Sequence, residues 1–182
     1  MISGWKPNPT APLWYSGGAN EPQGPFFSHL SVEHVKQQGP SCVATTLSMV
    51  VNSTGANTTP EDFKEVTNSQ APHTWSEALK PYGLQLAYCN SDLRRLGYFI
   101  DELVEYDDLF LLSFFSKDPP SDPLPSGKLC TAHIITLHKD TIYDTAKDKH
   151  AGGVCIADDY SRLERQTKRI FLFDPLYHPR CL

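Results

Sequence analysis

The stretch from Gln37 to Val51 constrains the fold more than any other part of the chain. It begins as a polar segment with a Gly39-Pro40 turn signal and becomes an apolar, periodic run at Cys42. The apolar positions recur at helical spacing, at Val43, Leu47 and Val50. This pattern predicts a helix with one buried face, capped by Ser41 and ended near Gly55.

Cys42 falls in the first turn of this predicted helix, which is a chemically special place. The first backbone N–H groups of a helix lack intrahelical partners, and the macrodipole places partial positive charge there. We therefore expect the pKa of the Cys42 thiol to be lowered and its nucleophilicity to be raised. Gln37 or Gln38 can offer a side-chain N–H that, with the Cys42 backbone N–H, holds an oxyanion. The structural alternative is that Cys42 is a small buried apolar residue.

The segment from Ala132 to Asp144 is typical of a tight hairpin. If its centre falls between His138 and Lys139, His133 lies directly across from Asp144, with Cβ atoms about 4.5–5.5 Å apart. Asp144 would then accept a hydrogen bond from the imidazole, fix its tautomer and stabilise its protonated form. The alternative for His133 is a polar strand residue without a catalytic role.

Two further possibilities concern the same histidine. Asp174 ends a predicted strand and is a second candidate for the residue that orients His133. A zinc site formed by Cys130, His133 and His138 is disfavoured, because alternation along a strand places His133 on the face opposite the other two. The sequence thus predicts no metal and no cofactor.

The remaining pattern predicts an α+β fold, with a helical lobe packed on an antiparallel sheet. Helix starts are indicated at Thr59–Asp62, Thr74–Glu77 and Ser91, the last opening a helix with Leu93, Leu96, Ile100 and Leu103 buried. Strands are indicated at Leu84–Tyr88, Leu109–Phe115, Gly152–Ala157 and Arg169–Pro175, with Leu109–Phe115 central. Residues 1–29 are expected to form an extended arm, and residues 30–182 are expected to form the globular domain. Within that domain, Ser116–Lys128 is expected to be a long loop.

Composition excludes several classes of function. The net charge is −5 and no uninterrupted basic block occurs, which argues against nucleic-acid binding. No apolar run is long enough for a membrane span or a signal peptide. The five cysteines are odd in number and widely spaced, so we expect a reducing, cytoplasmic location rather than a disulfide framework. Secretion as an effector, by a route without a cleavable signal, stays open.

Together these motifs resemble the papain-like cysteine peptidases, and they are most similar to the double-glycine leader peptidases of bacteriocin exporters. The matching elements are the run from Gln37 through Cys42 with its helix, the Thr74–Glu77 helix, Tyr82–Leu84, the Leu109 strand, and His133 followed by Asp144. The sequence departs from the family at Val43, where glycine is usual. It departs again at Lys36, where the family glutamine usually stands six residues before the cysteine.

The resemblance implies a peptide or protein substrate and a thiol hydrolase. Cys42 would be the nucleophile, His133 the general base and acid, Asp144 the orienter and Gln37 the oxyanion donor. A transamidase, acyltransferase or deamidase can use the same residues with another acceptor. A catalytically inactive, peptide-binding domain is the third hypothesis, motivated by Val43.

Overall fold

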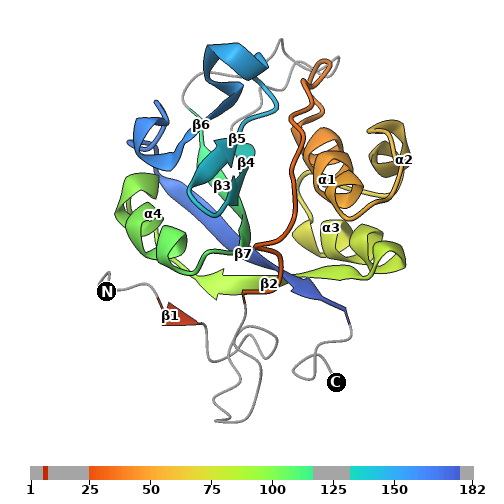
Figure 1. The fold of residues 1–182 in the computed structure, drawn as a ribbon, viewed down its shortest axis with the longest axis horizontal. Coiled ribbons are helices and arrows are strands. Elements are labelled where there is room, and N and C mark those ends of the chain that lie inside the picture. The colour runs from red at the N-terminus through yellow and green to blue at the C-terminus, as the bar shows by residue number, and fades with distance from the viewer. Residues whose placement is uncertain (1–5, 8–24, 117–131, 177–182) are drawn as a thin grey trace.

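The computed structural model describes residues 6–7, 25–116 and 132–176 of the 182-residue chain. Its described helices flank one antiparallel sheet, so the α+β architecture predicted from the sequence is confirmed (Figure 1). The helices are α1 (Cys42–Ser53), α2 (Glu61–Lys64), α3 (Pro72–Leu79) and α4 (Leu96–Glu105). The strands are β1 (Lys6–Pro7), β2 (Leu84–Asn90), β3 (Leu109–Phe115), β4 (Ala132–His138), β5 (Thr141–Tyr143), β6 (Val154–Ile156) and β7 (Thr167–Pro175). Short helical turns are η1 (Lys80–Tyr82), η2 (Lys149–Gly153) and η3 (Ala157–Asp159).

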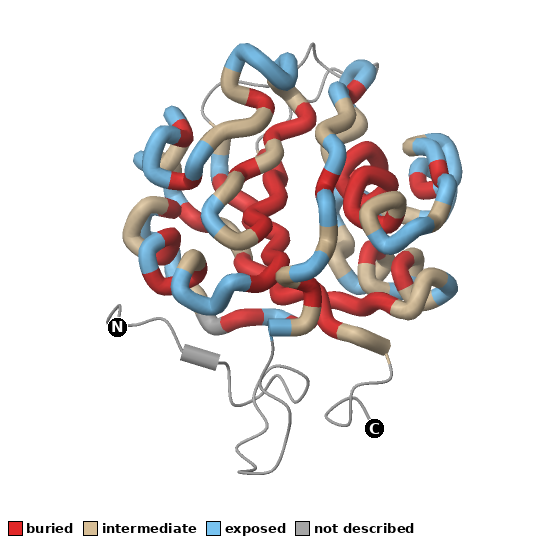
Figure 2. The backbone as a smooth tube through the Cα atoms, viewed as in Figure 1, coloured by how far each residue is buried: buried red, intermediate tan, exposed pale blue. Residues whose placement is uncertain are grey.

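The described strands form a single sheet in the order β1-β2-β7-β3-β4-β5-β6. β3 pairs with β7 on one side and β4 on the other, which confirms the central position predicted for Leu109–Phe115. Its run of apolar residues is explained by burial on both faces, because helices cover the sheet from two sides. Figure 2 shows the buried chain concentrated along these central strands.

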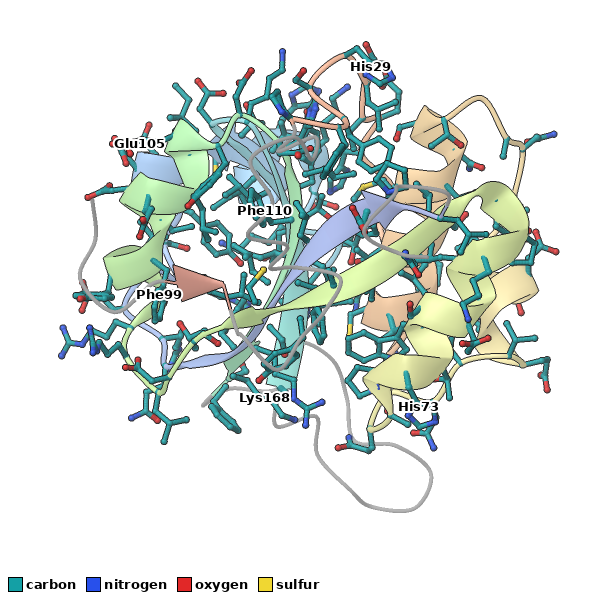
Figure 3. The ribbon with its side chains drawn as sticks, turned by 90° about the horizontal axis from the view of Figure 1, so that it is seen from below. His29, His73, Phe99, Glu105, Phe110 and Lys168 are labelled. Atoms are coloured by element: carbon teal, nitrogen blue, oxygen red, sulfur yellow. The ribbon has the colours of Figure 1, made fainter. Side chains whose placement is uncertain are left out.

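Each face of the sheet has its own apolar core. On one face, Leu47 and Val50 of α1 pack with Leu111 and Ile134 of the sheet. On the other face, α4 packs against β3, and Figure 3 shows Phe99 and Phe110 in the layer between them. The first core therefore fixes the helix that begins at Cys42, and the second packs against β4, the strand that carries His133.

Two predicted helix starts are wrong, and in both cases backbone geometry overrides the capping pattern. α3 begins at Pro72 rather than Thr74, because proline is favoured in the first turn; the Thr74 hydroxyl instead donates to the Ala71 carbonyl at 2.6 Å. α4 begins at Leu96 rather than near Ser91. Arg95 is extended and forms an isolated bridge with Gln166, so the chain just before Leu96 is held outside the helix.

That late start leaves Leu93, predicted to be buried, 62 % exposed. The predicted residues of the same helix that lie beyond its observed start are buried as expected: Leu96, Ile100 and Leu103. At α2, the Asp62 carboxylate accepts the Thr59 backbone N–H at 2.8 Å, as the capping pattern predicted. Capping patterns therefore located helices here, but a proline set where α3 begins and pairing between distant segments set where α4 begins.

The expected N-terminal arm is described only at residues 6–7 and from residue 25 onward. The backbone N–H groups of Phe26 and Phe27 donate to the buried Asp108 carboxylate at 2.9 and 3.0 Å. His138 Nε2 donates to the Phe27 carbonyl at 2.9 Å. From this anchor the chain runs extended beside the sheet to the start of α1 (Figure 1). Most of the predicted loop Ser116–Lys128 lies outside the described residues.

None of the described helices combines the length and the apolar character that crossing a bilayer requires.

Candidate active site

Cys42 is the first residue of α1, as the sequence predicted, and it is half-buried. Ser41 occupies the N-cap position, yet its side chain forms no capping bond to the helix. Its hydroxyl donates instead to the Gln38 carbonyl at 2.8 Å and shares a hydrogen bond with Thr45. The predicted cap residue therefore braces the loop before the helix, and the backbone N–H groups of the first turn are not capped by Ser41.

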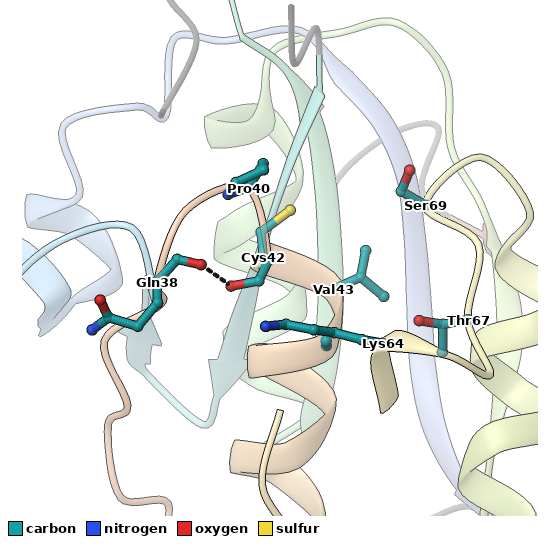
Figure 4. A pocket seen from close by; sticks show the side chains of 9 residues that line it. Gln38, Pro40, Cys42, Val43, Lys64, Thr67 and Ser69 are labelled. Atoms are coloured by element: carbon teal, nitrogen blue, oxygen red, sulfur yellow. Dashed lines mark hydrogen bonds between the residues drawn. The ribbon is translucent and has the colours of Figure 1, made fainter. Parts of the chain in front are cut away.

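A hollow of about 370 Å³ opens beside Cys42 (Figure 4). It is lined by Gln38, Pro40, Ser41, Cys42, Val43, Ala44, Lys64, Thr67 and Ser69. The lining combines apolar groups at the start of α1 with hydroxyl groups and the ammonium of Lys64, which pairs with Glu61 at 2.5 Å. The hollow is large enough to accept part of a peptide next to the thiol.

His133 and Asp144 are hydrogen-bonded, but the predicted register that placed them opposite each other is wrong. β4 pairs with β5 through Thr136–Tyr143 and Leu137–Ile142, so the turn lies at Lys139 and Asp140. Lys139 adopts a φ of 59°, which allows this two-residue turn. The partner of each β4 residue therefore shifts by two positions. A shift of two preserves the face of every side chain, so the two residues remain neighbours, on a diagonal.

The hydrogen bond between His133 and Asp144 is short and fully buried. His133 Nε2 donates to Asp144 Oδ1 at 2.7 Å, and both side chains are 0 % exposed. The imidazole also packs edge-on against Phe114, with ring centroids 5.6 Å apart. Among the described residues, His133 Nδ1 has no hydrogen-bond partner. One imidazole nitrogen is thus committed to the carboxylate, and the other is buried without a hydrogen-bond partner among the described residues.

Asp144 is held as a carboxylate by several donors. Besides His133, Oδ1 accepts the Ala146 backbone N–H at 2.9 Å and Oδ2 accepts the Tyr160 hydroxyl at 2.6 Å. Burial raises the pKa of Asp144, but the bond and charge of His133 together with the Tyr160 and Ala146 donors outweigh it and lower the pKa to about 2. The carboxylate is therefore ionised throughout the neutral range.

Asp174, the second candidate orienter, is excluded by strand geometry. Phe114 of β3 pairs with His133 on one side and with Thr167 on the other, so these three residues lie at the same level of the sheet. Asp174 lies seven residues further along β7 than Thr167, at the opposite end of the strand. At about 3.3 Å per residue this separation is roughly 20 Å, far beyond hydrogen-bond reach.

Gln37 is buried, and its side chain is tied at both ends. Its Oε1 accepts the Thr145 hydroxyl at 2.8 Å, and its Nε2 donates one hydrogen to the Gly39 carbonyl at 2.9 Å. Because an amide nitrogen carries two hydrogens, one N–H remains for another acceptor. Gln38 is exposed, and in Figure 4 its amide points away from the Cys42 sulfur. This orientation favours Gln37 over Gln38 as an oxyanion donor.

The segment that leads to Cys42 is fastened directly beside Asp144. His34 Nε2 donates to the Asp144 carbonyl at 2.9 Å, and Lys36 Nζ donates to the Ala146 carbonyl at 2.9 Å. The Gln37 backbone N–H donates to the Thr145 carbonyl at 2.8 Å. These bonds connect the segment that leads to Cys42 with the residues that follow β5, including Asp144.

Sequence reasoning missed three residues of this arrangement, His34, Thr145 and Tyr160. Each makes its contact with a residue that is 16 or more positions away. No local periodicity or spacing signals such a contact, since it depends on how the strands are assembled.

The two histidines weighed as metal ligands have separate partners, Asp144 for His133 and the Phe27 carbonyl for His138. Cys130 lies outside the described residues. Within the described parts of the chain, no three His, Cys, Asp or Glu side chains are grouped so as to hold a metal ion.

The fold was compared with those of known proteins. No protein-family model matches the chain, and no curated protein matches its sequence. Among solved structures, a double-glycine motif protease from an AMS/PCAT transporter, in complex with the leader peptide, aligns with 16 % identity and a TM-score of 0.50. The alignment covers 80 % of this chain and 93 % of that one.

The peptidase domain of Streptococcus ComA, a bi-functional ABC transporter involved in a quorum sensing pathway, aligns with 15 % identity and a TM-score of 0.52. That alignment covers 80 % of this chain and 99 % of the other. This chain has the papain-like fold of these peptidase domains. The architecture expected from the resemblance is therefore confirmed, and at these identities the likeness concerns the fold.

Proposed function

We propose that this protein is a cysteine peptidase that hydrolyses a peptide or isopeptide bond through Cys42, His133 and Asp144. The observation that carries the proposal is the buried His133–Asp144 pair, in which Nε2 is bonded to the carboxylate and Nδ1 has no partner among the described residues. A base oriented on one nitrogen and available on the other is what activation of a nearby thiol requires.

In the proposed mechanism the Cys42 thiol gives its proton to His133 Nδ1, and the thiolate sulfur attacks the carbonyl carbon of the substrate. The start of α1 favours this thiolate, because the backbone N–H groups and the dipole at a helix N-terminus stabilise negative charge. The protonated His133 then gives its proton to the leaving amine as the C–N bond breaks. Water, deprotonated by His133, cleaves the resulting thioester and regenerates the thiol.

The oxyanion formed in each half-reaction needs hydrogen-bond donors. We assign these to the Cys42 backbone N–H and the remaining Nε2 hydrogen of Gln37. The bonds from Gln37 to Thr145 and Gly39 support the assignment, because they hold the amide in one orientation before substrate arrives. A donor that is fixed in advance does not have to be ordered during the reaction.

A peptide is the substrate class that the hollow beside Cys42 supports, with its apolar wall and its polar groups. The structural neighbours are a protease bound to a leader peptide and the peptidase domain of an exporter. A peptide that carries a double-glycine motif is therefore the first substrate to test.

Selective alkylation tests the pairing of Cys42 with His133 without a known substrate. Iodoacetamide is added at pH 6, and the modified cysteines are quantified by peptide mapping. Cys155 is the internal reference, since burial raises the pKa of this half-buried thiol. We expect Cys42 to react at least tenfold faster than Cys155, and His133→Asn to slow Cys42 alone. Equal rates for the two cysteines, or no effect of His133→Asn, would refute the proposal.

Other acceptors for the same acyl-enzyme define the second candidate function. An amine or alcohol in place of water gives a transamidase or acyltransferase, and a glutamine side chain as acyl donor gives a deamidase. Mass spectrometry of products from peptides, with and without added amines, separates these reactions from proteolysis.

A catalytically inactive, peptide-binding domain is the non-enzymatic candidate. Val43 favours it, because this residue replaces the usual glycine and its side chain is buried in the α1 core. A binding-only domain would retain a double-glycine peptide with equal affinity in the wild type and in Cys42→Ala, and would release no product.

A further inference from the structure

Tyr160 contacts the proposed site without taking part in the mechanism. It follows η3, its side chain is 2 % exposed, and its hydroxyl donates to Asp144 Oδ2 at 2.6 Å. Asp144 Oδ1 is already occupied by His133 Nε2 at 2.7 Å and by the Ala146 N–H at 2.9 Å. The tyrosine therefore supplies the donor to the oxygen that faces away from the histidine.

The Tyr160 hydroxyl keeps its proton and so remains a hydrogen-bond donor. Burial raises the pKa of Tyr160, and the neighbouring Asp144 carboxylate raises it further, because a phenolate would be both desolvated and next to a negative charge. The phenol is therefore protonated over the whole range in which an enzyme works. Its bond favours the ionised form of Asp144 over the protonated form.

The ring is fixed from several sides. Phe114 packs edge-on against both His133 and Tyr160, with ring centroids 5.6 and 6.5 Å apart. Lys147 Nζ lies 5.0 Å from the Tyr160 ring centroid and is itself anchored by the Ser161 hydroxyl at 2.8 Å. The Ala157 N–H donates to the Asp140 carbonyl at 2.7 Å, so η3 is tied to the turn of the hairpin. The position of the hydroxyl follows from these contacts.

We propose that Tyr160 is a positioning residue of this active site, whose hydroxyl fixes the orientation and the ionised state of Asp144 and, through Asp144, the ring of His133. The inference rests on the proposed peptidase function. A core tyrosine that merely uses a nearby carboxylate as an acceptor would stabilise the fold and lower the pKa of Asp144 equally, but it would not affect the turnover of bound substrate.

The test compares Tyr160→Phe with Tyr143→Phe. The first removes one oxygen and keeps the ring that packs on Phe114; the second removes a hydroxyl from β5 that is not bonded to Asp144. We expect Tyr160→Phe to raise the acid dissociation pKa of Asp144, followed by carboxyl NMR, by about one unit. We expect kcat on a cleaved peptide to fall about tenfold with KM unchanged, and Tyr143→Phe to change neither quantity.

A double-mutant cycle tests whether the effect passes through the carboxylate. In an Asp144→Asn background, Tyr160→Phe should no longer lower kcat, because its partner charge is gone. A measurement on the wild type adds an arm that no folding defect can obscure: the Tyr160 hydroxyl proton should give a slowly exchanging NMR signal. Additive effects, an unchanged pKa of Asp144, or equal behaviour of the two tyrosine variants would overturn the inference.

These outcomes are separable from failure of the proposed function. If Cys42→Ala keeps full activity, the peptidase mechanism falls, whereas the NMR titration of Asp144 still reports on Tyr160. If Cys42→Ala is inactive and Tyr160→Phe matches the wild type in kcat and in the titration, only the role of Tyr160 falls.

Discussion

The two halves of the candidate site differ sharply in how firmly they are held. On the sheet, His133, Asp144 and Tyr160 are at most 2 % exposed and are connected by hydrogen bonds of 2.6 and 2.7 Å. On the helical side, Cys42 is half-buried and borders a hollow of about 370 Å³. The proposed base is built into the core, and the proposed nucleophile faces the space that a substrate would enter.

This difference matches two separate requirements of the proposed chemistry, a rigidly held base and an accessible nucleophile. A base and its carboxylate act best in a fixed geometry that needs no reorganisation during the reaction. A nucleophile must instead be reachable by the substrate. Substitutions on the sheet side should therefore reduce both folding stability and activity, whereas substitutions on the helical side should reduce activity alone.

The largest effect is expected at the nucleophile. Cys42→Ala should lower kcat/KM on a cleaved peptide by at least about 10⁴-fold, because the covalent step is lost. The unfolding midpoint in urea should stay close to that of the wild type, since the side chain is only half-buried. Cys155→Ala is the matched control and should keep its activity. A Cys42→Ala variant with wild-type turnover would remove the basis of the mechanism.

Substitution of His133, the proposed base, should reduce both activity and folding stability. His133→Ala should lower kcat by about 10³-fold and reduce the free energy of unfolding by about 3 kcal/mol, because it leaves the buried Asp144 carboxylate without its His133 hydrogen-bond donor. His138→Ala removes another buried histidine, bonded to the Phe27 carbonyl, and should reduce stability without affecting catalysis. Equal loss of activity in both variants would indicate that His133 acts only through the fold.

The oxyanion donor should have an intermediate effect that separates the two glutamines. Gln37→Ala should lower kcat by about 10²-fold, because it removes a fixed N–H donor together with the braces to Thr145 and Gly39. Gln38→Ala should stay within about twofold of the wild type. Steady-state kinetics on one peptide measure both variants, and the reverse ranking would assign the oxyanion to Gln38.

The smallest effect concerns the pH dependence of stability. The pKa of Asp144 is about 2 in the folded protein, below its ordinary value of 3.8. A carboxyl group with a depressed pKa stabilises the fold above its unfolded pKa, so about 2 kcal/mol should be lost as the pH falls from about 4 toward 2. Urea unfolding across this range measures the loss, and Asp144→Asn should remove this component.

Asp108 provides a control of opposite sign. Burial raises the pKa of Asp108 despite three backbone donors, so this carboxyl favours the folded state less as the pH rises above its ordinary pKa. Asp108→Asn should therefore remove a loss of stability at higher pH. If both variants changed the pH profile in the same direction, the assignment of Asp144 as the stabilising carboxylate would be wrong.

The sequence determined those features that depend on neighbours along the chain. The helix that begins at Cys42 and the central strand at Leu109–Phe115 were both predicted, because their periodicities reflect which faces are buried. The face shared by His133 and Asp144 was also predictable, since alternation survives a shift of two residues in register.

Only the tertiary structure decided the features that depend on contacts between distant segments. It chose Asp144 over Asp174, set the hairpin turn at Lys139 and Asp140, and brought Tyr160 to the carboxylate. It also committed the Ser41 hydroxyl to the loop rather than to the helix. The physical reason is the same in each case: short-range patterns fix the direction in which a side chain points, while the packing of strands and loops fixes which group it meets there.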